Sequence, residues 1–155
     1  MKPILAMRTL FATLVVVIWA PMTLFAVPVP TALRCEYLEN PLGIDVPRPR
    51  LSWRLTTRDA TERGQRQTAY QVLVASTPEV LARDTGDRWD SGRVQNDQSI
   101  QIEYAGTVLA SGQECYWKVR VWDAEGRASP WSDTAKSAAA YSASIPADEP
   151  DRWQD

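Results

Sequence analysis

The chain has 155 residues, with 17 lysines and arginines against 19 aspartates and glutamates, for a net charge of −2. This balance gives no basic footprint for a phosphate backbone, so nucleic acid is not an expected partner. The sequence contains no histidine, which excludes Ser-His-Asp and Cys-His catalytic sets and any metal site built on histidine. We expect no metal and no cofactor, and the length suits one domain with a short segment to spare.

Residues 1–26 have the composition of an export signal. Basic residues precede an apolar stretch that is free of charge, and a signal peptide removed after Ala26 fits best because Pro21 interrupts the apolar run. The alternative is an uncleaved membrane anchor, since residues 10–27 approach the length that spans a bilayer. The sequence therefore predicts an exported protein, periplasmic or extracellular, that contacts a membrane only if this segment is retained.

A β-sandwich domain is predicted over residues 33–141, after a linker at residues 27–32. Alternating apolar and polar side chains predict strands at residues 33–37 and 51–55. The connection between these strands is rich in proline, which has no amide hydrogen for a sheet, so we expect it to be irregular. Residues 142–155 are rich in serine, alanine, proline and acids, and are predicted as a tail or a truncated linker to a missing domain.

A third strand is predicted over residues 68–76. Both of its faces are apolar, which is typical of a strand at the centre of a sheet. Thr77 and Pro78 suit the N-cap and first position of a helix, and predict a short helical excursion that ends near Leu81.

Two further strands are predicted over residues 89–94 and 99–104. In the second of them, alternation places three apolar side chains on the inward face. These are Ile100, Ile102 and Tyr104.

Residues 115–123 form the clearest strand pattern in the chain. Its inward face is apolar and consists of Cys115, Trp117, Val119 and Val121. Its outward face consists of Tyr116, Lys118, Arg120 and Trp122. A last strand is predicted over residues 132–141. Seven short strands without a long helix after the export signal predict an all-β fold, an antiparallel seven-stranded β-sandwich.

The outward face of residues 115–123 supplies the candidate functional site. Trp131 begins the neighbouring strand, so we expect basic and aromatic side chains to stack across this hairpin. The structural interpretation is a cation–π ladder with Arg120 between the rings. The functional interpretation is a docking surface for a neighbouring domain or a glycan, formed by Tyr116, Arg120, Trp122 and Trp131.

Cys35 and Cys115 both fall in predicted strands. In an exported chain two cysteines suggest a disulfide between them. The simpler interpretation is two separate small core residues, because a disulfide tolerates only a narrow range of Cα separations.

Six segments follow one another in a characteristic order: residues 33–38 (LRCEYL), 40–45 (NPLGID), 49–53 (PRLSW), 67–76 (QTAYQVLVAS), 89–94 (WDSGRV) and 116–123 (YWKVRVWD). Together they resemble the N-terminal, fibronectin type III-like (immunoglobulin-like) domain of bacterial α-L-rhamnosidases, which are secreted glycoside hydrolases. In that family catalysis belongs to a later helical-barrel domain, so the resemblance implies no catalytic residue here. Fibronectin-like domains commonly carry a corner tyrosine at the place of Cys115, which leaves either Tyr116 to compensate or a weaker corner.

The resemblance implies a non-catalytic accessory domain, solitary or truncated, of a secreted α-L-rhamnosidase that acts on terminal rhamnose. Its implied partners are other domains of a rhamnosidase or a rhamnose-containing glycan. Asp90, Glu103 and Asp123 are available carboxylates, but nothing in the pattern makes them converge as glycoside hydrolysis requires. The alternatives are an independent carbohydrate-binding or domain-docking module, and a membrane-tethered interaction domain.

Overall fold

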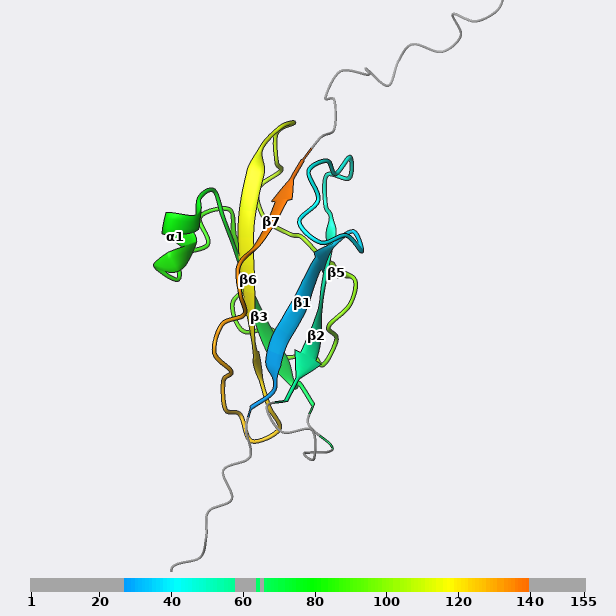
Figure 1. The fold of residues 1–155 in the computed structure, drawn as a ribbon. Coiled ribbons are helices and arrows are strands. Elements are labelled where there is room, and N and C mark those ends of the chain that lie inside the picture. The colour runs from blue at the N-terminus through cyan, green and yellow to red at the C-terminus, as the bar shows by residue number, and fades with distance from the viewer. Residues whose placement is uncertain (1–26, 58–63, 65, 140–155) are drawn as a thin grey trace, which may run out of the picture.

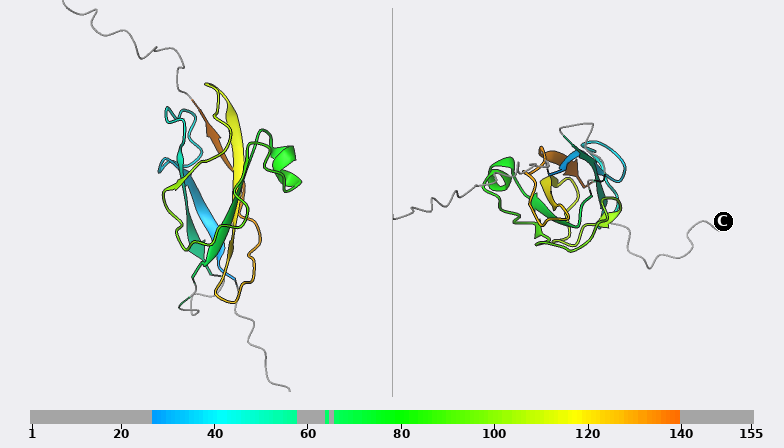
Figure 2. Two further views of the ribbon diagram at one scale, coloured as in Figure 1. Left: turned by 180° about the vertical axis from the view of Figure 1, so that it is seen from behind. Right: turned by 90° about the horizontal axis from the view of Figure 1, so that it is seen from below.

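The computed structural model describes residues 27–57, 64 and 66–139. The predicted export signal and the predicted C-terminal tail lie outside these residues. Two antiparallel sheets pack face to face, and the short helix α1 (Pro78–Ala82) projects beside one of them (Figures 1 and 2). No helix among the described residues is long and apolar enough to cross a membrane.

The two sheets contain the seven strands that the sequence predicts. The three-stranded sheet has the order β1 (Val29–Cys35), β2 (Arg50–Thr56), β5 (Ile102–Glu103). The four-stranded sheet has the order β4 (Trp89–Asp90), β3 (Ala69–Ala75), β6 (Glu114–Trp122), β7 (Ala135–Ala138). The antiparallel sandwich and the central place of β3 are therefore confirmed. The N-cap is confirmed as well, because the Thr77 hydroxyl accepts a hydrogen bond from the amide of Val80 at 3.3 Å.

The bounds of four strands differ clearly from the prediction: β5 covers only Ile102–Glu103 of the predicted residues 99–104, and β1, β4 and β7 differ as follows. β1 begins at Val29, inside the predicted linker, and includes Pro30, which an edge strand tolerates because its missing amide hydrogen costs no ladder bond. β4 ends at Asp90, where the chain turns through Gly92 at a φ of 60°. β7 is shorter than predicted, because the residues before Ala135 follow β6 through serine side chains, as described below.

The prediction that Ile100 faces inward is wrong. Gln101 has a φ of 57°, which breaks the alternation of a strand. Ile102 and Tyr104 are therefore buried as predicted, whereas Ile100 is 60% exposed.

The core between the sheets is built around two tryptophans, Trp53 and Trp117, both fully buried. The indole Nε1 of Trp53 donates to the side-chain oxygen of Gln67 at 3.0 Å, and the Gln67 amide in turn donates to the carbonyl oxygen of Gln98 at 2.8 Å. The Nε1 of Trp117 has no hydrogen-bond partner among the described residues. The two rings are thus equally buried but differ in their hydrogen bonding.

The proline-rich connection after β1 covers the free edge of β7. The Lys136 amide donates to the Asn40 side chain at 2.8 Å, and the Ala138 amide donates to the Pro41 carbonyl at 3.0 Å. The Ile44 amide returns a bond to the Ala138 carbonyl at 3.0 Å. Since an uncovered edge strand invites pairing with another chain, this irregular segment protects the sheet.

The corner before β6 is fastened by Tyr104. Its hydroxyl donates to the carbonyl oxygen of Thr107 at 2.7 Å. Tyr116 does not compensate for the missing corner tyrosine, because its hydroxyl binds the Glu114 carboxylate at 3.0 Å. Tyr104, which directly follows β5, therefore supplies the hydroxyl that holds this corner.

Cys35 and Cys115 are free thiols, each 1% exposed, on opposite sheets of one core. Burial raises the pKa of Cys35 to about 12 and that of Cys115 to about 11. We therefore expect neither thiol to react with Ellman's reagent at about pH 8 in the folded protein, and both to react once urea unfolds it. An unfolded protein with no reactive thiol would show instead that the two cysteines form the disulfide.

The turn after β1 is held by an ion pair. Arg50 Nη2 lies 2.7 Å from Glu36 Oε2, and the Arg50 amide donates to Glu36 Oε1 at 2.6 Å. The side-chain hydrogen bonds from Arg50 hold the pKa of the Glu36 carboxyl below its ordinary value of 4.5.

Because the folded-state pKa of Glu36 is depressed, its contribution to stability is complete above the unfolded pKa and is lost as the pH falls through the folded pKa. We expect the free energy of unfolding to decline below about pH 4.5, and to decline less in Glu36→Gln. Urea unfolding of both proteins at neutral and acidic pH measures this difference. Equal losses in the two proteins would assign the acid sensitivity to other carboxylates.

Candidate docking surface

Cations and indole rings alternate on the outward face of β6. The Lys118 Nζ lies 4.9 Å from the ring centroid of Trp131. The Arg120 guanidinium carbon lies 4.6 Å from the Trp131 centroid and 5.0 Å from that of Trp122. The Arg93 guanidinium carbon lies 4.7 Å from the Trp122 centroid. We call these five residues the cation–π ladder.

Strand alternation places three members of the ladder on one face of β6. Hydrogen bonds of Ser129 and Ser132 place the fourth member, Trp131. Lys118, Arg120 and Trp122 share a face because they are two residues apart on β6. The hydroxyl of Ser129 accepts from the Val121 amide at 3.0 Å, and the Ser129 amide donates to the Val121 carbonyl at 2.8 Å.

Ser132 forms the same two hydrogen bonds with Val119, which lies two residues before Val121 on β6. Ser132 accepts from the Val119 amide at 3.1 Å and donates its own amide to the Val119 carbonyl at 2.9 Å. The chain from Ser129 to Ser132 is thereby fixed along β6, and Trp131 is carried over its outward face.

The cations of the ladder are fixed by further hydrogen bonds. Arg120 donates to the side-chain oxygen of Gln71 from Nη2 at 2.7 Å and from Nε at 3.0 Å. Lys118 donates to the carbonyl oxygen of Leu81 at 2.7 Å and pairs with the Asp84 carboxylate. The Lys118 hydrogen bond holds the pKa of the Asp84 carboxyl below its usual range. The ladder thus joins β6 to β3 and to α1.

Three predicted site residues come together and one lies apart. Arg120 lies between Trp122 and Trp131, as the sequence indicates. Tyr116 has no cation–π contact among the described residues, and packs instead against the buried cluster of Leu73, Ala75 and Leu81. Sequence reasoning omitted Lys118, although its alternation on β6 points to it.

The fifth member of the ladder, Arg93, was also omitted from the predicted site. It comes from the turn after β4, and no spacing in the sequence relates it to Trp122. Its place depends on β3 lying between β4 and β6.

The ladder leaves little aromatic surface for a sugar. Each indole ring has two cations within 5.0 Å of its centroid, and Trp122 is only 8% exposed. A pyranose could stack on these rings only by displacing the cations. The geometry therefore favours the structural interpretation of the ladder over direct glycan binding.

The available carboxylates serve local structure at separate places. Asp90 accepts from the amide of Gly92 at 2.8 Å beside β4. Asp123 accepts from the Arg127 side chain at 2.8 Å after β6, and Glu103 lies on β5 beside an exposed arginine. In the described part of the chain no group of three or more histidine, cysteine, aspartate or glutamate side chains is placed to hold a metal ion.

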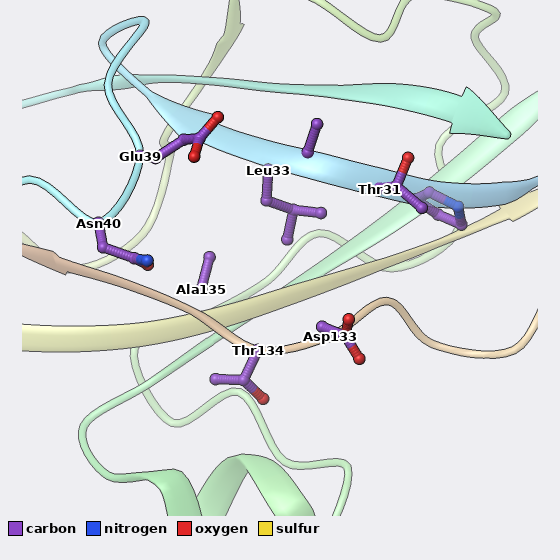
Figure 3. Close-up of a pocket in the computed structure, with 9 residues that line it drawn as sticks. Thr31, Leu33, Glu39, Asn40, Asp133, Thr134 and Ala135 are labelled. Atoms are coloured by element: carbon purple, nitrogen blue, oxygen red, sulfur yellow. The ribbon is translucent and has the colours of Figure 1, made fainter.

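A cavity of about 340 Å³ lies at the seam between β1 and the chain leading into β7. Two carboxylates, Glu39 and Asp133, line it. Figure 3 shows them at opposite ends of the cavity with Leu33 between them. The carboxylate of Glu39 also accepts from Arg34 at 3.0 Å. These two groups therefore do not converge on a common point as an acid and a base would.

Comparison with known proteins gives consistent matches. The family model described as the Rha78A-like, N-terminal immunoglobulin domain matches residues 30–142. An α-L-rhamnosidase of Streptomyces avermitilis is 46% identical over 102 residues, which cover 66% of this chain and 9% of that protein. An α-L-rhamnosidase of Alteromonas sp. is 37% identical over 107 residues, covering 68% of this chain and 11% of the relative.

The solved structures agree with these matches. The α-L-rhamnosidase from Dictyoglumus thermophilum aligns with a TM-score of 0.68 at 37% identity, over 73% of this chain and 12% of the other. The chain thus spans about a tenth of the length of the curated relatives that it matches.

Proposed function

Because the chain belongs to the family of Rha78A-like, N-terminal immunoglobulin domains, we propose that it serves as a non-catalytic accessory domain of an α-L-rhamnosidase. The match over residues 30–142 carries this proposal, since it covers the sandwich from the second residue of β1 onward, whereas the chain covers only 9–11% of the relatives. The glycosidase activity named for the relatives would then belong to other parts of the enzyme.

The chain's own chemistry supports this division of labour. Asp90, Glu103 and Asp123 are each engaged by neighbours at different places on the sandwich. Glycoside hydrolysis needs two carboxyl groups held about 5–9.5 Å apart around one sugar. The role of the domain is therefore to support and position the catalytic part.

The partner in this proposal is another domain of the same enzyme. The ladder supplies a rigid surface that includes the half-buried ring of Trp131, and the half-buried Tyr116 is also available for contact. Export through residues 1–26 would bring the protein to the periplasm or the outside of the cell, with a retained membrane anchor as the alternative. A rhamnose-containing glycan is the remaining partner, and the ladder is not well built to bind it directly.

The first test is the activity of the purified chain on an aryl α-L-rhamnoside. We expect no turnover above the buffer blank. Turnover that Asp90→Asn abolishes would overturn the proposal, because Asp90 would then be catalytic.

The second test exchanges domains. Residues 30–142 replace the matching segment of the Streptomyces avermitilis enzyme, and a second protein lacks that segment altogether. We expect the chimera to keep the parent's activity and melting temperature, and the deletion to melt lower. A deletion as stable and active as the parent would contradict a supporting role.

Arg120→Ala distinguishes docking from internal stability in the same chimera. If the ladder contacts another domain, the substitution should lower the melting temperature of the chimera more than that of the isolated chain. Arg83→Ala, at the exposed end of α1, is the matched control.

A further inference from the structure

A groove of about 210 Å³ lies on the outer face of the three-stranded sheet. Its floor comes from β1 and β2, and its far wall is the segment before β5. Tyr37 and Ile100 line it and are 56% and 60% exposed. Exposed aromatic and aliphatic side chains in a concave site are typical of ligand contact.

The same groove has one exposed guanidinium, that of Arg54, without an ion-pair partner among the described residues. Arg54 lines it, and no carboxylate of the described residues forms an ion pair with Arg54. Arg34 also lines it, but its Nη2 binds Glu39 at 3.0 Å and its Nε is buried, so we assign it no contact with a ligand. The neighbouring carboxylate of Glu36 is already paired with Arg50. Among the described residues, Arg54 is therefore the cation of the groove that remains available to an anionic ligand.

The backbone of the groove is held in an uncommon conformation. Ala32, Tyr37 and Gln101 all line it, and their φ angles are 49°, 67° and 57°. Residues other than glycine rarely adopt positive φ, and such positions gather where a site is shaped for a ligand. The side-chain amide of Gln101 donates to the Tyr37 hydroxyl at 3.0 Å, which ties the two walls together.

We propose that this groove binds an acidic saccharide unit. The apolar face of the sugar ring would pack against Tyr37 and Ile100. Its carboxylate would accept hydrogen bonds from the exposed guanidinium of Arg54, since a guanidinium matches a carboxylate in charge and shape. The choice of a saccharide rather than another anion rests on the proposed function.

The groove differs from the ladder in how far its rings and cations are already engaged by other side chains. In the ladder each ring already has two cations against it. In the groove one cation, Arg50, lies 5.3 Å from the Tyr37 centroid, and Arg54 has no ion-pair partner among the described residues. A ligand can therefore use the groove without displacing an ion pair.

Titration calorimetry of the full chain with de-esterified tetragalacturonate at low salt tests the proposal. The fully methyl-esterified tetramer is the matched ligand control, because it keeps the rings and removes the charge. We expect binding of the acid form and at least about tenfold weaker binding of the ester. No binding of the acid form, or equal binding of both forms, would overturn the proposal.

Variants then locate the site. Arg54→Ala removes the unpaired guanidinium, and Tyr37→Asn removes the ring with a residue that tolerates positive φ. Each should weaken binding about tenfold or more, whereas Arg83→Ala, on the opposite sheet's helix, should leave it unchanged. Circular dichroism confirms that each variant is folded.

Unchanged binding by folded Arg54→Ala and Tyr37→Asn would place the ligand elsewhere and overturn the assignment. The domain exchange described above does not depend on saccharide binding. A failure of this proposal is therefore distinguishable from a failure of the proposed function.

Discussion

Replacing Trp53 with alanine is expected to lower the free energy of unfolding by about 3–5 kcal/mol. The ring is 2% exposed and meets Tyr70 edge-on, with 5.3 Å between centroids. Truncation would leave a cavity between the sheets. It would also remove the donor to the buried side-chain oxygen of Gln67, so that a polar group loses its partner inside the core.

Phenylalanine at the two core tryptophans separates the hydrogen bond from the packing. Trp53→Phe keeps an aromatic ring but leaves Gln67 without its donor, at a cost of about 1–3 kcal/mol beyond the change in volume. Trp117→Phe should avoid that cost, because in the described part of the chain nothing accepts a hydrogen bond from the Trp117 Nε1. Urea unfolding followed by circular dichroism measures both variants. Equal destabilisation by the two would contradict a stabilising Trp53–Gln67 bond.

Replacing Arg127 with alanine is expected to destabilise the protein by about 2–3 kcal/mol. The Asp123 carboxylate is 1% exposed and accepts from the Arg127 side chain and from its amide, each at 2.8 Å. Without the guanidinium the carboxylate stays buried with one amide as its partner. The Arg127 side chain is 37% exposed, so the cost comes from the Asp123 charge, which remains buried and uncompensated when the guanidinium is removed.

A double-mutant cycle with Asp123→Asn tests the origin of that cost. Asparagine keeps an oxygen for the Arg127 amide and removes the charge. In the Asp123→Asn background, Arg127→Ala should therefore cost much less than in the natural chain. The same cost in both backgrounds would assign the effect to lost packing of the arginine stem instead.

Much of the fold followed from alternation along the strands. In β6 the predicted inward residues, Cys115 to Val121 at every second position, are all buried. β3 is central as its two apolar faces indicate. These elements were predictable because their pattern is local and long enough to fix which face is buried. Ile100 was misplaced because the positive φ of Gln101 leaves no trace in hydrophobicity.

The candidate site was predictable only in part. Arg120 and Trp122 share a face by spacing alone, and Trp131 was expected beside them. The contribution of Arg93 depends on β4 lying next to β3, which no local pattern specifies. The groove beside Tyr37 was missed altogether, because it joins β1, β2 and the segment before β5, three parts of the chain that are distant in sequence.

The sequence by itself determined the sandwich, its faces and its likeness to the first domain of α-L-rhamnosidases, since strand alternation and ordered motifs are properties of neighbouring residues. Only the tertiary structure decided which charged side chains already have an ion-pair or cation–π partner. It showed the ladder rings engaged by their own cations, and it left Arg54 without an ion-pair partner among the described residues. The reason is physical: a charge is paired or free according to which distant strands fold beside it, and that depends on the whole sheet order rather than on spacing.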